Sequence, residues 1–300
     1  MRIAMIGLGD IARKAYLPIV ATHGDITPLI CTRDTKVLNQ VQRQYRIAET
    51  FTQLDAVIEA RPDLAMIHSS TDSHYPIARR LLEAGIPVFV DKPVSYHYHE
   101  TAELVELAAK KHLPFLVGFN RRFAPLYQAC RNIPVRQLHY QKNRVQQPAT
   151  TREFILDDFI HVLDFVRFCS PAEPTDLQIF SHSSGGLLCS VQVQWQCDQA
   201  LFTAAMNRQH GNNEELLRYV SDNEHWQVDN LASGCHVRDG KQEYLGFGDW
   251  TPTLEKRGFV AMIDQMLEVV RTGQGGNNYE DILATHKLCE DVVEYIDRAF

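Results

Sequence analysis

From residue 2 the chain reads Arg2-Ile3-Ala4-Met5-Ile6-Gly7-Leu8-Gly9-Asp10-Ile11-Ala12. An apolar run of strand length is followed by two closely spaced glycines and a helix-like stretch. Gly7 permits a tight turn, Gly9 lets the backbone approach a ligand, and the small Ala12 allows close packing of helix on strand. The first N–H groups of that helix would attract an anion. The segment therefore predicts a turn that binds a diphosphate, at the start of a dinucleotide-binding fold.

The chain up to about residue 120 continues with short apolar runs that alternate with amphipathic segments. Apolar strands joined by helices are typical of a parallel sheet covered on both faces. The prediction is an α/β domain over residues 1–120, built as a Rossmann doubly wound parallel sheet. Its strands are expected at Arg2–Ile6, Ile26–Cys31, Leu64–His68, Val88–Val90 and Phe115–Gly118, and its helices at Ile11–Ala21, Thr35–Tyr45, Tyr75–Ala84 and Tyr98–Lys111.

The pattern changes after Arg122, where a helix over Glu153–Phe168 precedes segments with period-two alternation. Such alternation indicates strands with one solvated face. The prediction is an α+β domain over residues 121–300 on a mostly antiparallel sheet, serving substrate binding and oligomerisation, with a C-terminal helix that could pack back on the first domain. Its strands are expected at Leu177–His182, Leu187–Trp195, Leu201–Asn207 and Leu216–Ser221, and its last helices at about Leu254–Arg271 and Tyr279–Ala299, around the glycine-rich link 272–276.

The composition is that of a globular protein, and 300 residues favour two domains. The net charge of −7 disfavours nucleic acid and anionic membranes as partners, and no apolar segment reaches membrane-spanning length. Seven scattered cysteines without a Cys-x-x-Cys pair indicate reduced thiols in a cytoplasmic protein and no zinc site. His97-Tyr98-His99-Glu100 is interpreted as a helix start rather than a metal site.

The end of the second predicted strand bears on the choice between NAD and NADP. An acidic residue there would bind the ribose 2′-hydroxyl of NAD. The chain instead reads Cys31-Thr32-Arg33-Asp34, so that Thr32 takes the acid's place and Arg33 can pair with a 2′-phosphate. NADP(H) is therefore the predicted cofactor. NAD(H) stays open, because Asp34 could take the acid's role instead of capping the next helix.

Polar residues follow several predicted strands, where ligands of a doubly wound sheet gather. On the second-domain helix, Asp157 and His161 are four residues apart and share a face. Asp158 and Asp164 of that helix are expected to face solvent or to pack. Beyond the glycine turn, Thr32 and Arg33, the predicted cofactor-binding residues are Ser69, Ser70, Thr71, His74, Asp91, Lys92, Pro93, Asn120 and Arg122.

Four motifs together resemble the Gfo/Idh/MocA oxidoreductases over nearly the whole chain. They are the Gly-x-Gly-x-x-Ala turn, Asp91-Lys92-Pro93, Gly118-Phe119-Asn120-Arg121-Arg122-Phe123-Ala124-Pro125, and the spaced pair Asp157 and His161. The order of the motifs matches the family as well as their residues. Within it, the chain is most similar to the MviM-like oxidoreductases, whose segments matching His68–Thr71 and Asp91–Pro93 read much the same.

The resemblance implies that Lys92, Asp157 and His161 are catalytic. In the oxidation direction His161 would accept the hydroxyl proton while hydride leaves for the nicotinamide, and in reverse it would protonate the alkoxide. Lys92 would hydrogen-bond the reacting oxygen, and Asp157 would orient the substrate or tune the other two side chains. The family also implies a cis Lys92–Pro93 peptide.

Two departures limit what the resemblance implies. Asp91 replaces the commoner Glu, which is a minor change. Phe159 lies two residues after Asp157, where the family usually carries Gly, and its ring could narrow or redirect the substrate pocket. A sugar or inositol specificity is therefore not transferred.

The predicted function is hydride transfer to or from a hydroxyl-bearing carbon of a sugar, polyol or related small molecule. The alternative is a non-catalytic regulator that binds NADP and sugar on the same scaffold. A third hypothesis, an enzyme similar to biliverdin reductase, is disfavoured by the presence of both Asp157 and His161. The sheet is expected to leave an apolar face uncovered, with Val191, Val193, Trp195 and Leu201 as examples, and such a face would be a subunit contact. A homodimer or larger assembly is therefore predicted.

Overall fold

The computed structural model describes residues 1–131, 133–273 and 279–298. Packing divides the chain into two compact units. The first comprises Met1–Gly118 and Phe259–Leu283, and the second comprises Phe119–Gly258 and the chain from Ala284. Residues 274–276 of the predicted glycine-rich link and Ala299 of the predicted last helix lie outside the described residues. Each unit is described by itself.

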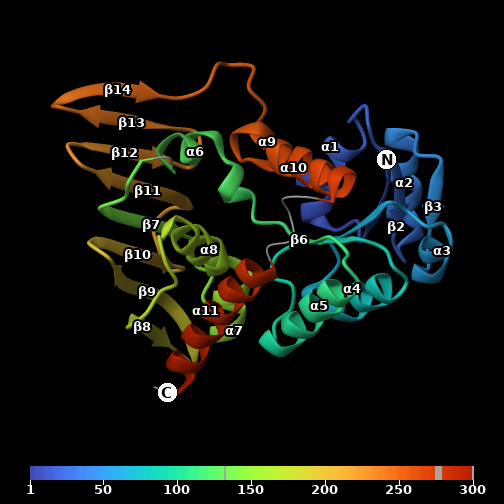
Figure 1. The fold of residues 1–300 in the computed structure, drawn as a ribbon, viewed down its shortest axis with the longest axis horizontal. Coiled ribbons are helices and arrows are strands. Elements are labelled where there is room, and N and C mark those ends of the chain that lie inside the picture. Colours follow the sequence, from blue (N-terminus) through green and yellow to red (C-terminus); the bar gives the residue numbers. More distant parts are fainter. Residues whose placement is uncertain (132, 274–278, 299–300) are drawn as a thin grey trace. The chain divides into compact units, whose positions relative to one another are not determined.

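The first unit contains the predicted doubly wound sheet (Figure 1). Its six strands are all parallel and lie in the order β3-β2-β1-β4-β5-β6. Because β1 separates β2 from β4, the winding direction reverses beside β1, where ligands of such sheets bind. The strands are β1 Arg2–Ile6, β2 Thr27–Cys31, β3 Glu49–Phe51, β4 Leu64–Ile67, β5 Val88–Val90 and β6 Phe115–Val117. β3 is short and half-buried, and the sequence did not reveal it.

Local sequence explains how the helices of this unit begin and which side they bury. Asp34 caps α2 by accepting hydrogen bonds from the N–H groups of Lys36 (2.9 Å) and Val37 (3.1 Å), and Leu38 and Val41 then face the core. A wide, π-helical turn at Ala12–Tyr16 leads into the first helix. The helices are α1 Leu17–Val20, α2 Thr35–Tyr45, α3 Leu54–Glu59, α4 His74–Glu83, α5 Tyr98–Lys110 and α10 Phe259–Thr272.

The second unit is built on the predicted, mostly antiparallel sheet. Its eight strands lie in the order β14-β13-β12-β11-β7-β10-β9-β8, and β7 and β10 are the parallel neighbours. The strands are β7 Gln137–Asn143, β8 Gln178–Ser184, β9 Leu187–Cys197, β10 Ala200–Asn207, β11 Glu214–Ser221, β12 Glu224–Asp229, β13 Ser233–Arg238 and β14 Lys241–Leu245. The sequence pattern did not reveal β7, β12, β13 or β14.

Helices cover one face of this sheet, which corrects the expected uncovered apolar face (Figure 1). Val191, Val193 and Trp195 are buried on the covered face, whereas Leu201 points to the opposite side and is 51% exposed. Alternation along β9 located its apolar side chains correctly but could not tell that the helix at Thr151–Phe154 packs on β9 and the helix at Ile160–Cys169 on the neighbouring β10 and β7. The helices are α6 Pro125–Arg131, α7 Thr151–Phe154, α8 Ile160–Cys169, α9 Thr253–Lys256 and α11 Tyr279–Arg298.

Two further observations concern the described residues as a whole. All seven cysteines are free thiols. None of the helices described in residues 1–131, 133–273 and 279–298 combines the length and apolar character needed to cross a membrane.

Candidate active site

The glycine turn after β1 has the geometry that a bound diphosphate requires. Gly7 has a φ of +87°, and its N–H donates to the carbonyl oxygen of Cys31 at 2.9 Å. A Cβ at Gly7 would lie 2.5 Å from the backbone nitrogen of Ser69, so no other residue fits there. Around Gly9 the nearest atom to such a Cβ is 3.9 Å away, which leaves the backbone approachable. Ala12, the first residue of the π-helical turn that follows, is fully buried, so the glycine turn fits the dinucleotide that the sequence predicts.

The end of β2 leaves a cation available beside this turn. Asp34 uses its carboxylate to cap α2. Arg33 is exposed, and no partner for its guanidinium occurs in the described residues. Thr32 is half-buried, and its hydroxyl oxygen lies 3.4 Å from the backbone nitrogen of Asp34. A basic group and a neutral hydroxyl thus stand where an acid would select NAD.

A second group of predicted residues follows β5. Asp91 is buried and accepts hydrogen bonds from the Tyr16 hydroxyl (3.1 Å) and from the backbone N–H of Lys92 (2.9 Å). Burial raises the pKa of the Asp91 carboxyl, although the charges of Lys92 and His74 act against this. The Lys92–Pro93 peptide is cis, as the resemblance implied, and the Lys92 side chain is half-buried.

His74 joins the segments that follow β4 and β5. Its Nδ1 lies 2.9 Å from the carbonyl oxygen of Pro93, and its Nε2 lies 3.0 Å from that of Ser69. Ser73 adds local bonds, because its hydroxyl donates to the Ser70 carbonyl at 2.7 Å and its oxygen lies 2.7 Å from the Ser69 hydroxyl oxygen. The structure therefore brings His74, Ser69 and Pro93 together, and the contacts of His74 position the segment that carries Lys92.

In the second unit, Asp157 lies in a wide helical turn, Ile155–Phe159, that interrupts the helix just before His161. Such π-type turns are frequent at functional sites. Phe159 is fully buried, so its ring belongs to the core. Arg121, whose Nη1 lies 3.2 Å from both ring nitrogens of His161, can only donate hydrogen bonds. The guanidinium of Arg121 thus lies against the imidazole ring of His161.

The predicted residues Asn120 and Arg122 have partners within the same unit. Asn120 donates from Nδ2 to the Arg257 carbonyl (2.8 Å), and its Oδ1 accepts from Arg121 (2.9 Å). Arg122 forms a two-point ion pair with Asp164, with Nε to Oδ2 at 2.9 Å. Asp164 is 1% exposed, so of the two alternatives expected for it, facing solvent or packing, the structure shows packing. The role of Asn120 and Arg122 in binding a cofactor stays a prediction.

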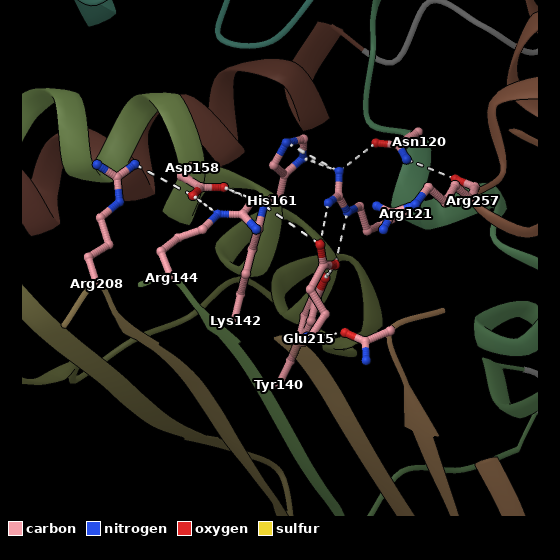
Figure 2. Close-up of polar contacts among 11 residues, drawn as sticks. Asn120, Arg121, Tyr140, Lys142, Arg144, Asp158, His161, Arg208, Glu215 and Arg257 are labelled. Carbon is pink, nitrogen blue, oxygen red and sulfur yellow. Dashed lines mark hydrogen bonds and ion pairs between the residues drawn. The ribbon is translucent and has the colours of Figure 1, made fainter. Parts of the chain in front are cut away.

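A buried ion network lies beneath His161 (Figure 2). Arg121 pairs with Glu215 at 2.6 Å, and the Tyr140 hydroxyl donates to the same carboxylate at 2.8 Å. Lys142 pairs with Asp158 and lies 3.8 Å from Glu215. Burial opposes ionisation of the Glu215 carboxyl, yet Arg121 and Lys142 lower its pKa well below the ordinary value.

This network was missed by sequence reasoning, and it shows that Asp158 packs rather than faces solvent, which is one of the two alternatives expected for it. The carboxyl of Asp158 is buried and ion-paired, because three cations reach it from the sheet. Period-two alternation contained a signal: Leu138, Tyr140 and Lys142 occupy one face of β7, which places the lysine on the apolar side. Burial and the charge of Arg121 lower the pKa of Lys142 to about 7, against the opposing effects of its two carboxylate neighbours.

The two units define a class of protein, a doubly wound dinucleotide-binding domain followed by an α+β domain. Residues 1–119 match the Gfo/Idh/MocA oxidoreductase family with an NAD-binding Rossmann fold, and residues 125–238 match the YceM-like C-terminal domain. The chain is 31% identical over 282 residues to YceM of Salmonella typhimurium, with 90% of each protein covered. The chain belongs to the Gfo/Idh/MocA oxidoreductase family, which confirms the resemblance found in its motifs.

Solved structures agree. A Gfo/Idh/MocA family oxidoreductase from Vibrio cholerae is 40% identical with a TM-score of 0.95, covering 100% of this chain and 99% of that one. The dehydrogenase MviM from Clostridium difficile is 26% identical with a TM-score of 0.92, covering 98% and 99%. A more distant relative, UDP-N-acetylglucosamine 3-dehydrogenase from Acidithiobacillus ferrooxidans, is 25% identical over 185 residues, or 59% of this chain and 57% of that protein.

Proposed function

We propose that the chain is an NADP(H)-dependent oxidoreductase that acts on a hydroxyl-bearing carbon of a sugar, a polyol or a related small molecule. The observation that carries the proposal is the Gly7 turn, where only glycine fits, in the same unit as a half-buried Lys92 at the end of β5. Membership of an oxidoreductase family supports hydride transfer, and the relative that oxidises a nucleotide sugar supports the substrate class.

The proposed roles belong to three side chains. When bound, NADP(H) supplies the acceptor or donor of the hydride. In oxidation His161 accepts the hydroxyl proton, for which a neutral imidazole is needed, and a positive charge such as that of Arg121 beside the ring disfavours a second one on it. Lys92 donates a hydrogen bond to the reacting oxygen and stabilises negative charge on it. Asp157 orients the substrate beside His161.

The preference for NADP(H) is supported by the exposed Arg33 and by the engagement of Asp34 in the cap of α2. We expect Arg33→Ala to weaken NADPH binding about tenfold or more, because a charge-assisted contact with the 2′-phosphate is lost. NADH binding should not change. Dissociation constants for both nucleotides, measured by fluorescence, test this. Equal affinities of the unmodified protein for NADH and NADPH would contradict the preference.

Turnover tests the enzymatic role. NADPH and NADP⁺ are supplied with a panel of sugars, polyols and their keto forms, and a substrate is identified by the change in absorbance of the nicotinamide. Lys92→Ala should then lower kcat by about 100-fold or more while the dissociation constant of NADPH stays the same. Unchanged kcat in that variant would remove Lys92 from the mechanism. Nucleotide binding without turnover of any panel member would favour the non-catalytic regulator.

We also propose a homodimer or larger assembly in the cytoplasm. Phe180 (58% exposed) and Leu201 lie on the sheet face that the helices leave open, and large exposed apolar side chains are common at subunit contacts. Seven unpaired thiols suit a reducing compartment. Light scattering at micromolar concentration should give at least twice the monomer mass, and a strictly monomeric species would contradict the assembly.

A further inference from the structure

Three basic side chains converge on Asp158 in the second unit (Figure 2). Lys142 forms an ion pair with it, Arg144 donates from Nε at 2.9 Å and from Nη2 at 3.3 Å, and Arg208 places Nη2 3.6 Å away. Asp158 directly follows the proposed catalytic Asp157 in the wide helical turn. The basic cluster, defined as Lys142, Arg144 and Arg208, therefore lies next to the proposed chemistry.

The register of the sheet places the two arginines together. β7 and β10 are parallel, and their last residues, Asn143 and Asn207, are register partners. Arg144 and Arg208 are the next residues along the two strands, so they occupy equivalent positions at neighbouring carboxyl ends. Like charges side by side on a sheet are destabilising unless something compensates them.

In the described residues, the basic groups of this region outnumber the carboxylates that contact them. Four cations, the basic cluster and Arg121, share two close carboxylates, Asp158 and Glu215. Asp157 and Glu153 act on Arg208 from farther away, but Glu153 is exposed and bonded to Thr150. With Asp157 counted, three carboxylates face three guanidinium groups and the Lys142 amine, whose pKa is about 7.

Two donors of the cluster have no protein partner among the described residues. Nε of Arg208 is buried and makes no hydrogen bond, in a residue that is 8% exposed. Arg144 uses Nε and Nη2 on Asp158, and its side chain is 29% exposed, so its remaining donor can be reached from outside. An unpaired buried donor costs about 1–3 kcal/mol, which an acceptor on a ligand would recover.

We propose that Arg144 and Arg208 bind an anionic group, a carboxylate or a phosphate, of the substrate. That the ligand is a substrate rests on the proposed function, whereas the binding of an anion at this site does not. Asp158 is then the internal counter-ion that holds the arginines in place, and the ligand's anion accepts hydrogen bonds from the arginine donors that Asp158 leaves unused. An anion held there would place the substrate within about one helical turn of Asp157 and His161.

Direct binding tests the proposal without need of turnover. D-glucuronate, D-glucose 6-phosphate and neutral D-glucose are titrated calorimetrically into the full chain at constant ionic strength, with saturating NADPH so that the glycine turn is filled. We expect at least one acidic sugar to bind about tenfold or more tightly than glucose, and the tighter of the two identifies the carboxylate or the phosphate. Arg144→Gln should remove this preference.

The matched control is Arg136→Gln, which removes the same charge from the same unit. Arg136 is exposed and pairs with Asp222, just before β7. The proposal is overturned if neither acidic sugar binds more tightly than glucose, or if the control loses the preference equally. If Arg144→Gln does not fold, two other measurements test the proposal. One is the ranking of the three probes on the unmodified chain. The other is the Arg144→Lys variant, which keeps the charge but loses the two-point contact.

The outcome separates the two proposals. If Arg144-dependent anion binding occurs in a protein that fails to bind NADPH or to turn over any substrate, the proposed function fails and the anion site stands. If turnover depends on Lys92 but the best substrates are neutral and insensitive to Arg144→Gln, the proposed function stands and the anion site fails.

Discussion

Replacing Gly7 by alanine should damage both stability and nucleotide binding. The residue has a φ of +87°, a conformation that costs an ordinary L-residue roughly 1–2 kcal/mol. The added Cβ would also lie 2.5 Å from the nitrogen and 2.7 Å from the Cα of Ser69, both rigid backbone atoms. Overpacking of this kind costs about 1–3 kcal/mol. We therefore expect Gly7→Ala to lower the free energy of unfolding by about 2–5 kcal/mol.

Gly85→Ala is the matched control, because Gly85 has a φ of +79° but no atom within 4 Å of the added Cβ. It should lose only the conformational part, about 1–2 kcal/mol. Urea unfolding measures both variants, and fluorescence titration measures NADPH binding, which should weaken about tenfold or more in Gly7→Ala because the turn must shift where the diphosphate binds. Equal loss of stability in the two variants, with NADPH affinity unchanged, would refute the reasoning.

Two further predictions concern buried ionisable groups. Asp158→Asn leaves three basic side chains facing a neutral amide and should lower the free energy of unfolding of the second unit by about 3–5 kcal/mol in a denaturation assay. Asp222→Asn, at an exposed ion pair, should cost about 1 kcal/mol or less in the same assay. Similar losses in the two variants would contradict a buried role for Asp158. Burial, with the charge of His74, lowers the pKa of His68 from 6.5 to about 3, so between these values the unfolded chain takes up a proton that the folded chain does not. Stability of the unmodified protein should therefore fall relative to His68→Leu by about 1.4 kcal/mol per pH unit as the pH drops through that window, and parallel curves would refute the buried neutral imidazole.

Local sequence determined the first unit to a large extent. Most strands of this unit are short apolar runs and the glycine turn has a mandatory glycine, so both can be recognised from neighbouring residues alone. The short β3 was missed because its residues Glu49–Phe51 are half-buried and show no apolar run. The cis peptide at Lys92–Pro93 followed from the family resemblance rather than from any physical property of those residues.

The polar interior of the second unit was decided by tertiary structure. An aspartate on an amphipathic helix is ordinarily solvated. The residues around Asp158 do not indicate its ion pair with Lys142, and those around Asp164 do not indicate its ion pair with Arg122. Those partners come from segments at least 16 residues away, and strand register and helix placement decide whether they meet. A buried charge is tolerated only when its partners are in place, which is a property of the assembled unit.

By itself, then, the sequence determined the class of fold, the nucleotide turn and the order of the family motifs, because each depends on residues that are close along the chain. Only the folded chain decided which charges are buried and which donors lack partners. It also placed Arg144 beside Arg208 at the ends of β7 and β10. The physical reason is that desolvation and Coulomb interactions depend on distances in space, and those distances are set by packing between segments remote in sequence.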